Sequence, residues 1–112
     1  MKVNILGTEY EVFLDVDPDQ DKKLEEADGY MDFSVKKIVI AKFEADNNSV
    51  EDLKDHTKKV LRHEIIHAFL YESGLWSSSG NVRAWAISEE ITDWIALQSP
   101  KLLKAFKECD CI

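Results

Sequence analysis

This sequence has little that would indicate a disulfide-linked, nucleic-acid-binding or membrane protein. Its two cysteines, Cys109 and Cys111, stand near the C-terminus, where they cannot link parts of a core. Cationic residues are outnumbered, with a net charge of −8 and no basic cluster. No apolar run is long enough to cross a membrane, and no signal-peptide core follows Met1. We therefore expect a cytoplasmic protein that binds neither nucleic acid nor membranes.

The pattern of apolar residues predicts one small α+β domain over residues 1–112. Residues of about 2–42 contain short β-patterned runs, which predict antiparallel strands with a hairpin turn at Gly7-Thr8. Two helices are expected next, at about 49–72, capped by Ser49, and at about 82–98. Pro100 is expected to open a last short helix before the tail, within residues 100–112. The expected strands are Lys2–Leu6, Glu9–Val16, Tyr30–Phe33 and Lys36–Lys42.

The acidic segment of residues 15–28 raises the possibility of a calcium loop. Asp15, Asp17 and Asp19 alternate as they do in an EF-hand, but Gln20 replaces the glycine of the sharp turn and Pro18 restricts the backbone. A solvated loop or a short acidic helix is the expected structure.

Two further groups of residues, three lysines and three tryptophans, have simple structural interpretations. The lysines at positions 36, 37 and 42 suit an exposed sheet edge or the wall of a peptide groove, and the tryptophans at 76, 85 and 94 suit a core or a pocket lining.

The segment His63-Glu64-Ile65-Ile66-His67 has the pattern HExxH inside the first predicted helix. Positions four apart lie on one face of a helix, so His63 and His67 can present two imidazoles to one metal ion. Glu64 projects about 100° around the axis, from where its carboxylate can reach a metal-bound water without being a ligand. His56 lies about 10 Å before His63 along the axis and is expected to be a surface histidine.

The second half of this helix is apolar around most of its circumference, so the HExxH residues are expected to be enclosed. Burying polar groups without partners costs roughly several kcal/mol, and a bound metal would satisfy them. The apolar residues are Val60, Leu61, Ile65, Ile66, Ala68, Phe69 and Leu70.

A third ligand must come from another element, and the second predicted helix offers carboxylates. Glu89 and Asp93 lie four apart, on a face that they share with apolar residues. Glu89 is the preferred third ligand, and Asp93 is expected to accept a hydrogen bond from His63 and orient its ring. Glu90 projects about 100° away, beside Arg83, and is the alternative to Glu89. The apolar residues of that face are Val82, Trp85, Ala86, Ala96 and Leu97.

Together these residues resemble the gluzincin metallopeptidases, the thermolysin-like clan, whose pattern is HExxH followed by N-E-x-x-S/T-D. The resemblance covers roughly residues 60–94, and more loosely Gly29–Ile40, which looks like the edge strand of small zincins, including those of phages and prophages. It implies a zinc ion held by His63, His67 and Glu89. Glu64 would be the general base and Asp93 the acceptor behind the first histidine. Ser88 stands where the family often has asparagine.

The resemblance is incomplete where the family stabilises the tetrahedral intermediate, because no histidine follows His67 in this sequence. Tyr71 and Arg83 are the candidate donors, although Tyr71 can also simply pack and Arg83 can pair with Glu90. The expected activity is zinc-dependent hydrolysis of a peptide or protein substrate. One alternative is a phage-type interaction module in which zinc is structural, and another is a regulatory peptidase that cleaves one partner. The sequence does not indicate an oligomeric state.

Overall fold

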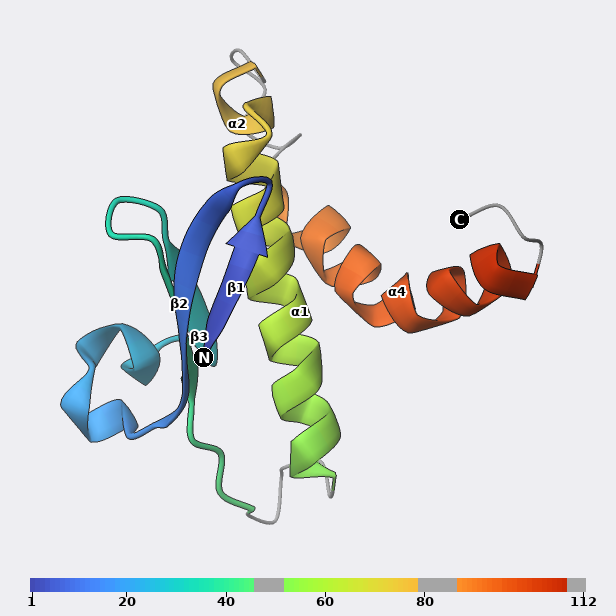
Figure 1. The fold of residues 1–112 in the computed structure, drawn as a ribbon. Helices are drawn as coiled ribbons and strands as arrows, with labels where there is room; N and C mark the ends of the chain where they lie inside the picture. The colour runs from blue at the N-terminus through green and yellow to red at the C-terminus, as the bar shows by residue number, and fades with distance from the viewer. Residues whose placement is uncertain (46–51, 79–86, 109–112) are drawn as a thin grey trace.

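The computed structural model describes residues 1–45, 52–78 and 87–108. Its four strands form one sheet in the order β1-β2-β4-β3, and α1 packs on one face of that sheet (Figure 1). The fold is therefore a small α+β domain, as predicted. Its elements are β1 (Lys2–Ile5), β2 (Thr8–Val16), the short 3₁₀ helices η1 (Pro18–Gln20) and η2 (Lys22–Glu25), β3 (Gly29–Asp32), β4 (Lys37–Ala41), α1 (Leu53–Glu72), α2 (Leu75–Ser78) and α4 (Glu89–Glu108).

The sheet is mixed, so the prediction of antiparallel strands is wrong at its centre. β1 pairs antiparallel with β2, and β3 with β4, but β2 and β4 run parallel, with Val12 opposite Ile38. The chain passes from β2 through η1 and η2 to the outer strand β3, and β4 then returns between β2 and β3. Lys37 consequently lies in an inner strand and not at a sheet edge. Of the segment Gly29–Ile40, which resembles the edge strand of small zincins, only Gly29–Asp32 forms the outer strand, β3.

Alternation of side chains along the strands gives the sheet two packed faces. Ile38 and Ile40 point toward α1, whereas Val39 and Ala41 point to the opposite face, where Leu24 of η2 covers them. The hairpin turn is formed by Leu6 and Gly7, one residue earlier than predicted. The buried core between the sheet and α1 consists of Ile5, Tyr10, Val12, Ile38, Ile40 and Ala68.

Two carboxylates of the acidic segment accept hydrogen bonds from backbone amides of the same segment. The Asp17 side chain accepts a hydrogen bond from the amide of Asp19, and the Asp21 side chain accepts one from the amide of Lys23. These bonds cap η1 and η2, so two short helical turns replace the open loop that an EF-hand pattern would need.

The first long helix, α1, begins at Leu53, later than predicted. Asp52 caps it, because its side chain accepts a hydrogen bond from the amide of Asp55 at 3.0 Å. Ser49, the predicted cap, lies outside the described residues. The second half of α1 is less enclosed than expected: Glu64, His67 and Ala68 are buried, but Phe69 is exposed. The helix ends at Glu72, where Ser73 and Gly74 stop it as predicted.

The last helix is one element, so the prediction of a separate helix opened by Pro100 is wrong. α4 runs from Glu89 to Glu108 with Pro100 inside it, and Figure 1 shows that it bends and that its later part leads away from α1. Ser88 caps its first turn, with its hydroxyl accepting from the amide of Ile91 at 3.3 Å. The predicted start at Val82 falls outside the described residues. In the described part of the chain, no helix combines the length and apolar character needed to cross a membrane.

Candidate metal centre

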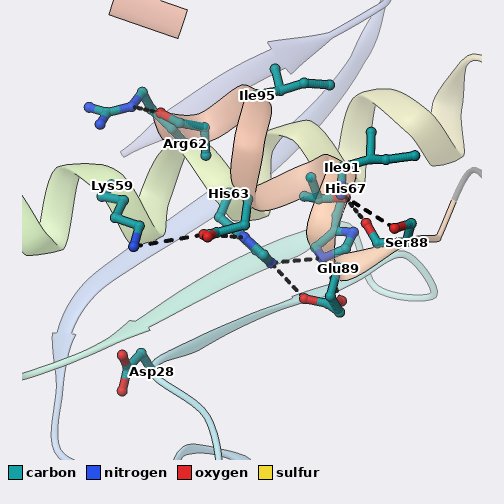
Figure 2. Close-up of polar contacts among 12 residues, drawn as sticks. Asp28, Lys59, Arg62, His63, His67, Ser88, Glu89, Ile91 and Ile95 are labelled. Carbon is teal, nitrogen blue, oxygen red and sulfur yellow. Dashed lines mark hydrogen bonds and ion pairs between the residues drawn. The ribbon is translucent and has the colours of Figure 1, made fainter. Parts of the chain in front are cut away.

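Three side chains from two helices converge on one point. His63 and His67 project from the same face of α1, with their Nε2 atoms 3.0 Å apart. Glu89, the first residue of α4, places one carboxylate oxygen 2.9 Å from His63 Nε2 and the other 3.0 Å from His67 Nε2 (Figure 2). The structure therefore brings together the three residues that the sequence predicts as metal ligands.

The chemistry and spacing of these atoms fit a zinc ion. Imidazole nitrogen and carboxylate oxygen are both ordinary zinc ligands, at roughly 2.0–2.2 Å, and two ligands of one tetrahedral ion are then roughly 3–3.5 Å apart. The ligand atoms of His63, Glu64 and His67 also all lie within 4.8 Å of one another. When the imidazoles are neutral and Glu89 is ionised, these groups offer lone pairs toward one point. A cation relieves that accumulation of negative charge.

Glu64 occupies a different position from Glu89. Its side chain is buried beside the two histidines, and no donor of the described residues hydrogen-bonds to it. Burial first, and then the nearby charge of Glu89, raise the pKa of Glu64 to about 7. A carboxylate with this pKa can accept and return a proton near neutral pH, as a general base must.

The two histidines differ in what their second ring nitrogen contacts. His63 Nδ1 lies 3.5 Å from an Asp93 carboxylate oxygen, the contact predicted to orient this ring. His67 Nδ1 is buried and has no hydrogen-bond partner among the residues that the structure describes. Burial is also the main cause that lowers the pKa of His67, which favours the neutral imidazole that binds metals.

The carboxylate face of α4 is more open than predicted. The side chain of Glu89 is 74% exposed and that of Asp93 is 44% exposed, so they border a cleft and are not enclosed by apolar residues. Glu90 is exposed and forms no hydrogen bond or ion pair with the described residues, so the geometry favours Glu89 over Glu90 as the ligand. Leu97 is exposed, whereas Ala96 is buried. The other apolar residues predicted for this face, at positions 82, 85 and 86, lie outside the described residues.

Tyr71, one candidate for stabilising the intermediate, lies in an aromatic cluster beyond the site. Its ring stacks on Phe33 at a centroid distance of 4.4 Å and meets the edge of Trp76 at 5.4 Å. The ammonium of Lys36 lies 4.9 Å from the centre of the same ring. Tyr71 does not line the cleft. The other candidate, Arg83, lies outside the described residues, as do Cys109 and Cys111.

A cleft of about 850 Å³ runs beside the histidines. Strand β3 forms one wall, where Gly29 lets α1 approach closely: a Cβ at this position would lie 3.0 Å from Val60 Cγ1 and 2.9 Å from Ile40 Cδ1. Trp76 and Ile87 line the cleft as well. Trp76 agrees with its predicted role as a pocket residue, whereas Trp94 is exposed.

His56 and Asp28 also line the cleft, which the sequence analysis missed. His56 Nε2 lies 3.0 Å from an Asp28 carboxylate oxygen, and the His56 ring packs edge-on against Phe43. A spacing of seven residues places His56 on the same side of α1 as His63, and that spacing was the available signal. Nothing in the sequence indicated Asp28, because the path of β3 alone brings it there.

Comparison of this chain with protein-family models, with curated proteins and with solved structures found no match. The function is therefore inferred from the residues and geometry of this site.

Proposed function

We propose that this protein is a zinc-dependent peptidase of the gluzincin type, which hydrolyses peptide bonds in a peptide or protein substrate. The observation that carries this proposal is the state of Glu64. Its side chain is largely buried at the wall of the cleft, next to two imidazoles and the carboxylate of Glu89, and its pKa is raised to about 7. An acid in this position can exchange a proton with water in the cleft, whereas a purely structural metal site does not need that carboxylate.

In this proposal each residue of the site has a separate role in hydrolysis. His63, His67 and Glu89 would hold the zinc ion, which, when bound, polarises the substrate carbonyl and lowers the pKa of a bound water toward ~7. Glu64 removes a proton from the attacking water and returns it to the leaving amine. Asp93 holds the His63 ring through Nδ1, 3.5 Å away. The cleft along β3 gives an extended chain a place to lie beside these groups.

The alternative is a zinc-binding interaction module of the phage type that does not catalyse hydrolysis. The position of Tyr71 favours this alternative, because its ring is packed against Phe33 and Trp76 and does not line the cleft. Losing one donor to the developing oxyanion typically lowers a hydrolytic rate about 10²–10³-fold. A slow peptidase that acts on a single partner protein is compatible with the same observation.

The test combines metal analysis with hydrolysis of a peptide library by the wild type and three variants. Glu64→Gln is expected to keep about one zinc ion per chain and to hydrolyse roughly 10²–10⁴-fold more slowly. Glu89→Ala is expected to lose most of the zinc. Glu90→Ala is the matched control, since it removes the neighbouring exposed carboxylate, and it is expected to keep both zinc and activity.

Each outcome separates the two functions. Zinc bound by the wild type and Glu64→Gln, with hydrolysis by the wild type alone, supports the peptidase. Zinc bound by both with no cleavage of any library peptide supports the interaction module. Zinc lost from Glu90→Ala but kept by Glu89→Ala would show that the third ligand has been assigned to the wrong residue.

A further inference from the structure

The helix that carries Glu89 has little apolar packing to hold it in place. On the side toward α1 it buries Thr92 and Ala96, which are small. Of its larger apolar residues, Ile95 and Leu102 are half-buried, whereas Ile91, Trp94 and Leu97 are exposed, Trp94 to 56%. Because burial stabilises roughly in proportion to apolar area, this interface contributes less than a helix docked through its large side chains would. Polar contacts therefore add to the apolar packing that fixes α4 against α1.

Pro100 creates the most unusual of these contacts. Proline has no amide hydrogen, so the carbonyl of Ala96, four residues earlier, has no donor within the helix. The side chain of Arg62 on α1 replaces it: Arg62 Nε donates to the Ala96 carbonyl oxygen at 2.6 Å (Figure 2). The hydroxyl of Ser99 donates to the neighbouring carbonyl, that of Ile95. The bend in α4 therefore leaves a carbonyl that a residue of another helix satisfies.

The hydrogen bond to the Ala96 carbonyl is the polar contact that the structure shows for the Arg62 side chain among the described residues. Arg62 forms no ion pair with any carboxylate of the described residues, although arginine side chains commonly do. Besides the contacts of His63 and His67 with Glu89 and Asp93 at the site itself, the pair of Lys59 and Asp93 also links α1 to α4. These two residues are 3.8 Å apart and partly exposed, and such pairs contribute little. Arg62 directly precedes His63, and Ala96 lies two turns, about 10 Å, beyond Glu89 on α4. The bond thus joins the helix of the two imidazoles to the helix of the carboxylate.

We infer that Arg62 is a positioning residue for the metal centre. By binding the carbonyl that Pro100 leaves free, Arg62 sets the distance between α1 and α4 and so holds the Glu89 carboxylate about 3 Å from both imidazoles. This inference rests on the proposed metal site. Arg62 does not touch the substrate or the metal, and its effect reaches the site only through the position of α4.

The experiment uses two measurements on the full chain. Hydrogen exchange over residues 89–99 of the zinc-free protein reports how firmly α4 is held, and competition with a chelator reports the affinity for zinc. In Arg62→Met, exchange of this segment is expected to rise several-fold or more, and zinc affinity to fall roughly 10–100-fold, as it does when groups supporting a ligand are removed. Arg62→Lys keeps a donor and is expected to recover part of the affinity.

A double variant distinguishes two roles of Arg62: positioning α4 against α1, and providing a hydrogen-bond donor for the Ala96 carbonyl. In Arg62→Met with Pro100→Ala, the amide of residue 100 can donate to Ala96, so the thermal stability lost in Arg62→Met should return. The link between α1 and α4 is still absent, so zinc affinity should stay low. Glu72→Gln, which destabilises the other end of α1, is the control for lost stability in general and should keep wild-type zinc affinity.

The inference is overturned if Arg62→Met retains wild-type exchange and affinity, or if the double variant recovers affinity together with stability. It is also overturned if Glu72→Gln loses as much affinity as Arg62→Met. A wild-type protein that binds no zinc would contradict the proposed function instead. In that case the exchange of α4 still shows whether Arg62 holds the helix, because that measurement requires neither metal nor hydrolysis.

Discussion

Glu64 and Glu72 lie on the same helix, eight residues apart, and their surroundings are opposite. Glu72, 14% exposed, accepts hydrogen bonds from Lys36 at 2.7 Å, Tyr10 at 2.8 Å and Thr8 at 3.3 Å. The bond from Lys36 is the main cause that lowers the pKa of Glu72. Glu64 is more deeply buried, has no such donor among the described residues, and has a raised pKa.

The difference separates the end of α1 that hydrogen-bonds to the sheet and its turn from the part that lines the cleft. At Glu72 the sheet supplies every partner that the carboxylate needs, so this end of α1 is tied to β2 and to the turn before β4. At Glu64 no donor of the described residues is within hydrogen-bond distance, and the side chain lines the cleft. An acid of raised pKa at a cleft wall, beside two convergent histidines, is the observation on which we base the proposed function.

The largest expected effect concerns Glu64 in the zinc-free protein. Its pKa is raised from 4.5 to about 7, so the folded state holds the proton more tightly than the unfolded state. The stability that this proton provides is complete below pH ~4.5 and is lost as the pH rises to about 7, a change on the order of 3 kcal/mol. Glu64→Gln removes this dependence.

Unfolding by urea in the presence of a chelator, from pH 4 to pH 8, measures this effect as the difference between the wild type and Glu64→Gln. His67 acts in the opposite direction, because its pKa is lowered and the folded state is disfavoured as the pH falls below about 6.5. Both proteins contain His67, so the difference isolates Glu64. Parallel stability curves across this range would show that Glu64 is not strained by burial.

A smaller effect is expected at Glu72. Glu72→Gln replaces charge-assisted hydrogen bonds by neutral ones and should lower the free energy of unfolding at pH 7 by roughly 1.5–3 kcal/mol. Because the pKa of Glu72 is lowered, its contribution is present above the ordinary value of 4.5 and is lost as the pH falls through the lowered value. The two proteins should therefore converge in stability toward acid pH. Zinc content should not change, and its loss would contradict the assignment of this end of α1 as structural.

The smallest expected effect is that of Lys36, one of the three donors to Glu72. Lys36→Met leaves the bonds from Tyr10 and Thr8 in place and should cost about 1 kcal/mol in urea unfolding. Lys37→Met is the matched control, because Lys37 forms no ion pair with the described residues and only approaches the Tyr30 ring, at 5.7 Å from its centre. It should change stability by less than about 0.5 kcal/mol. Equal effects of the two substitutions would mean that the Lys36 contact with Glu72 contributes nothing specific.

Much of the fold could be predicted from local patterns. Alternation in residues 2–42 located the strands within a residue or two, and the HExxH spacing placed two histidines on one face of a helix. The parallel pairing of β2 with β4 could not be predicted, because alternation gives a strand and its faces but not its neighbour. Pro100 by itself predicts a helix boundary, since proline usually breaks a helix. In the structure α4 continues through it, and Arg62 of α1 donates to the carbonyl of Ala96, four residues before Pro100.

The candidate site divides in the same way. The sequence by itself determined the chemical groups: two imidazoles and a glutamate at fixed spacing on one helix, with acids on a second helix, since covalent spacing and helix geometry are local. Only the tertiary structure decided that Glu89 and not Glu90 meets the histidines, that Tyr71 packs beyond the cleft, and that β3 forms a cleft wall. These depend on how separate elements are rotated and spaced against one another, and that arrangement arises from contacts between residues far apart in the chain.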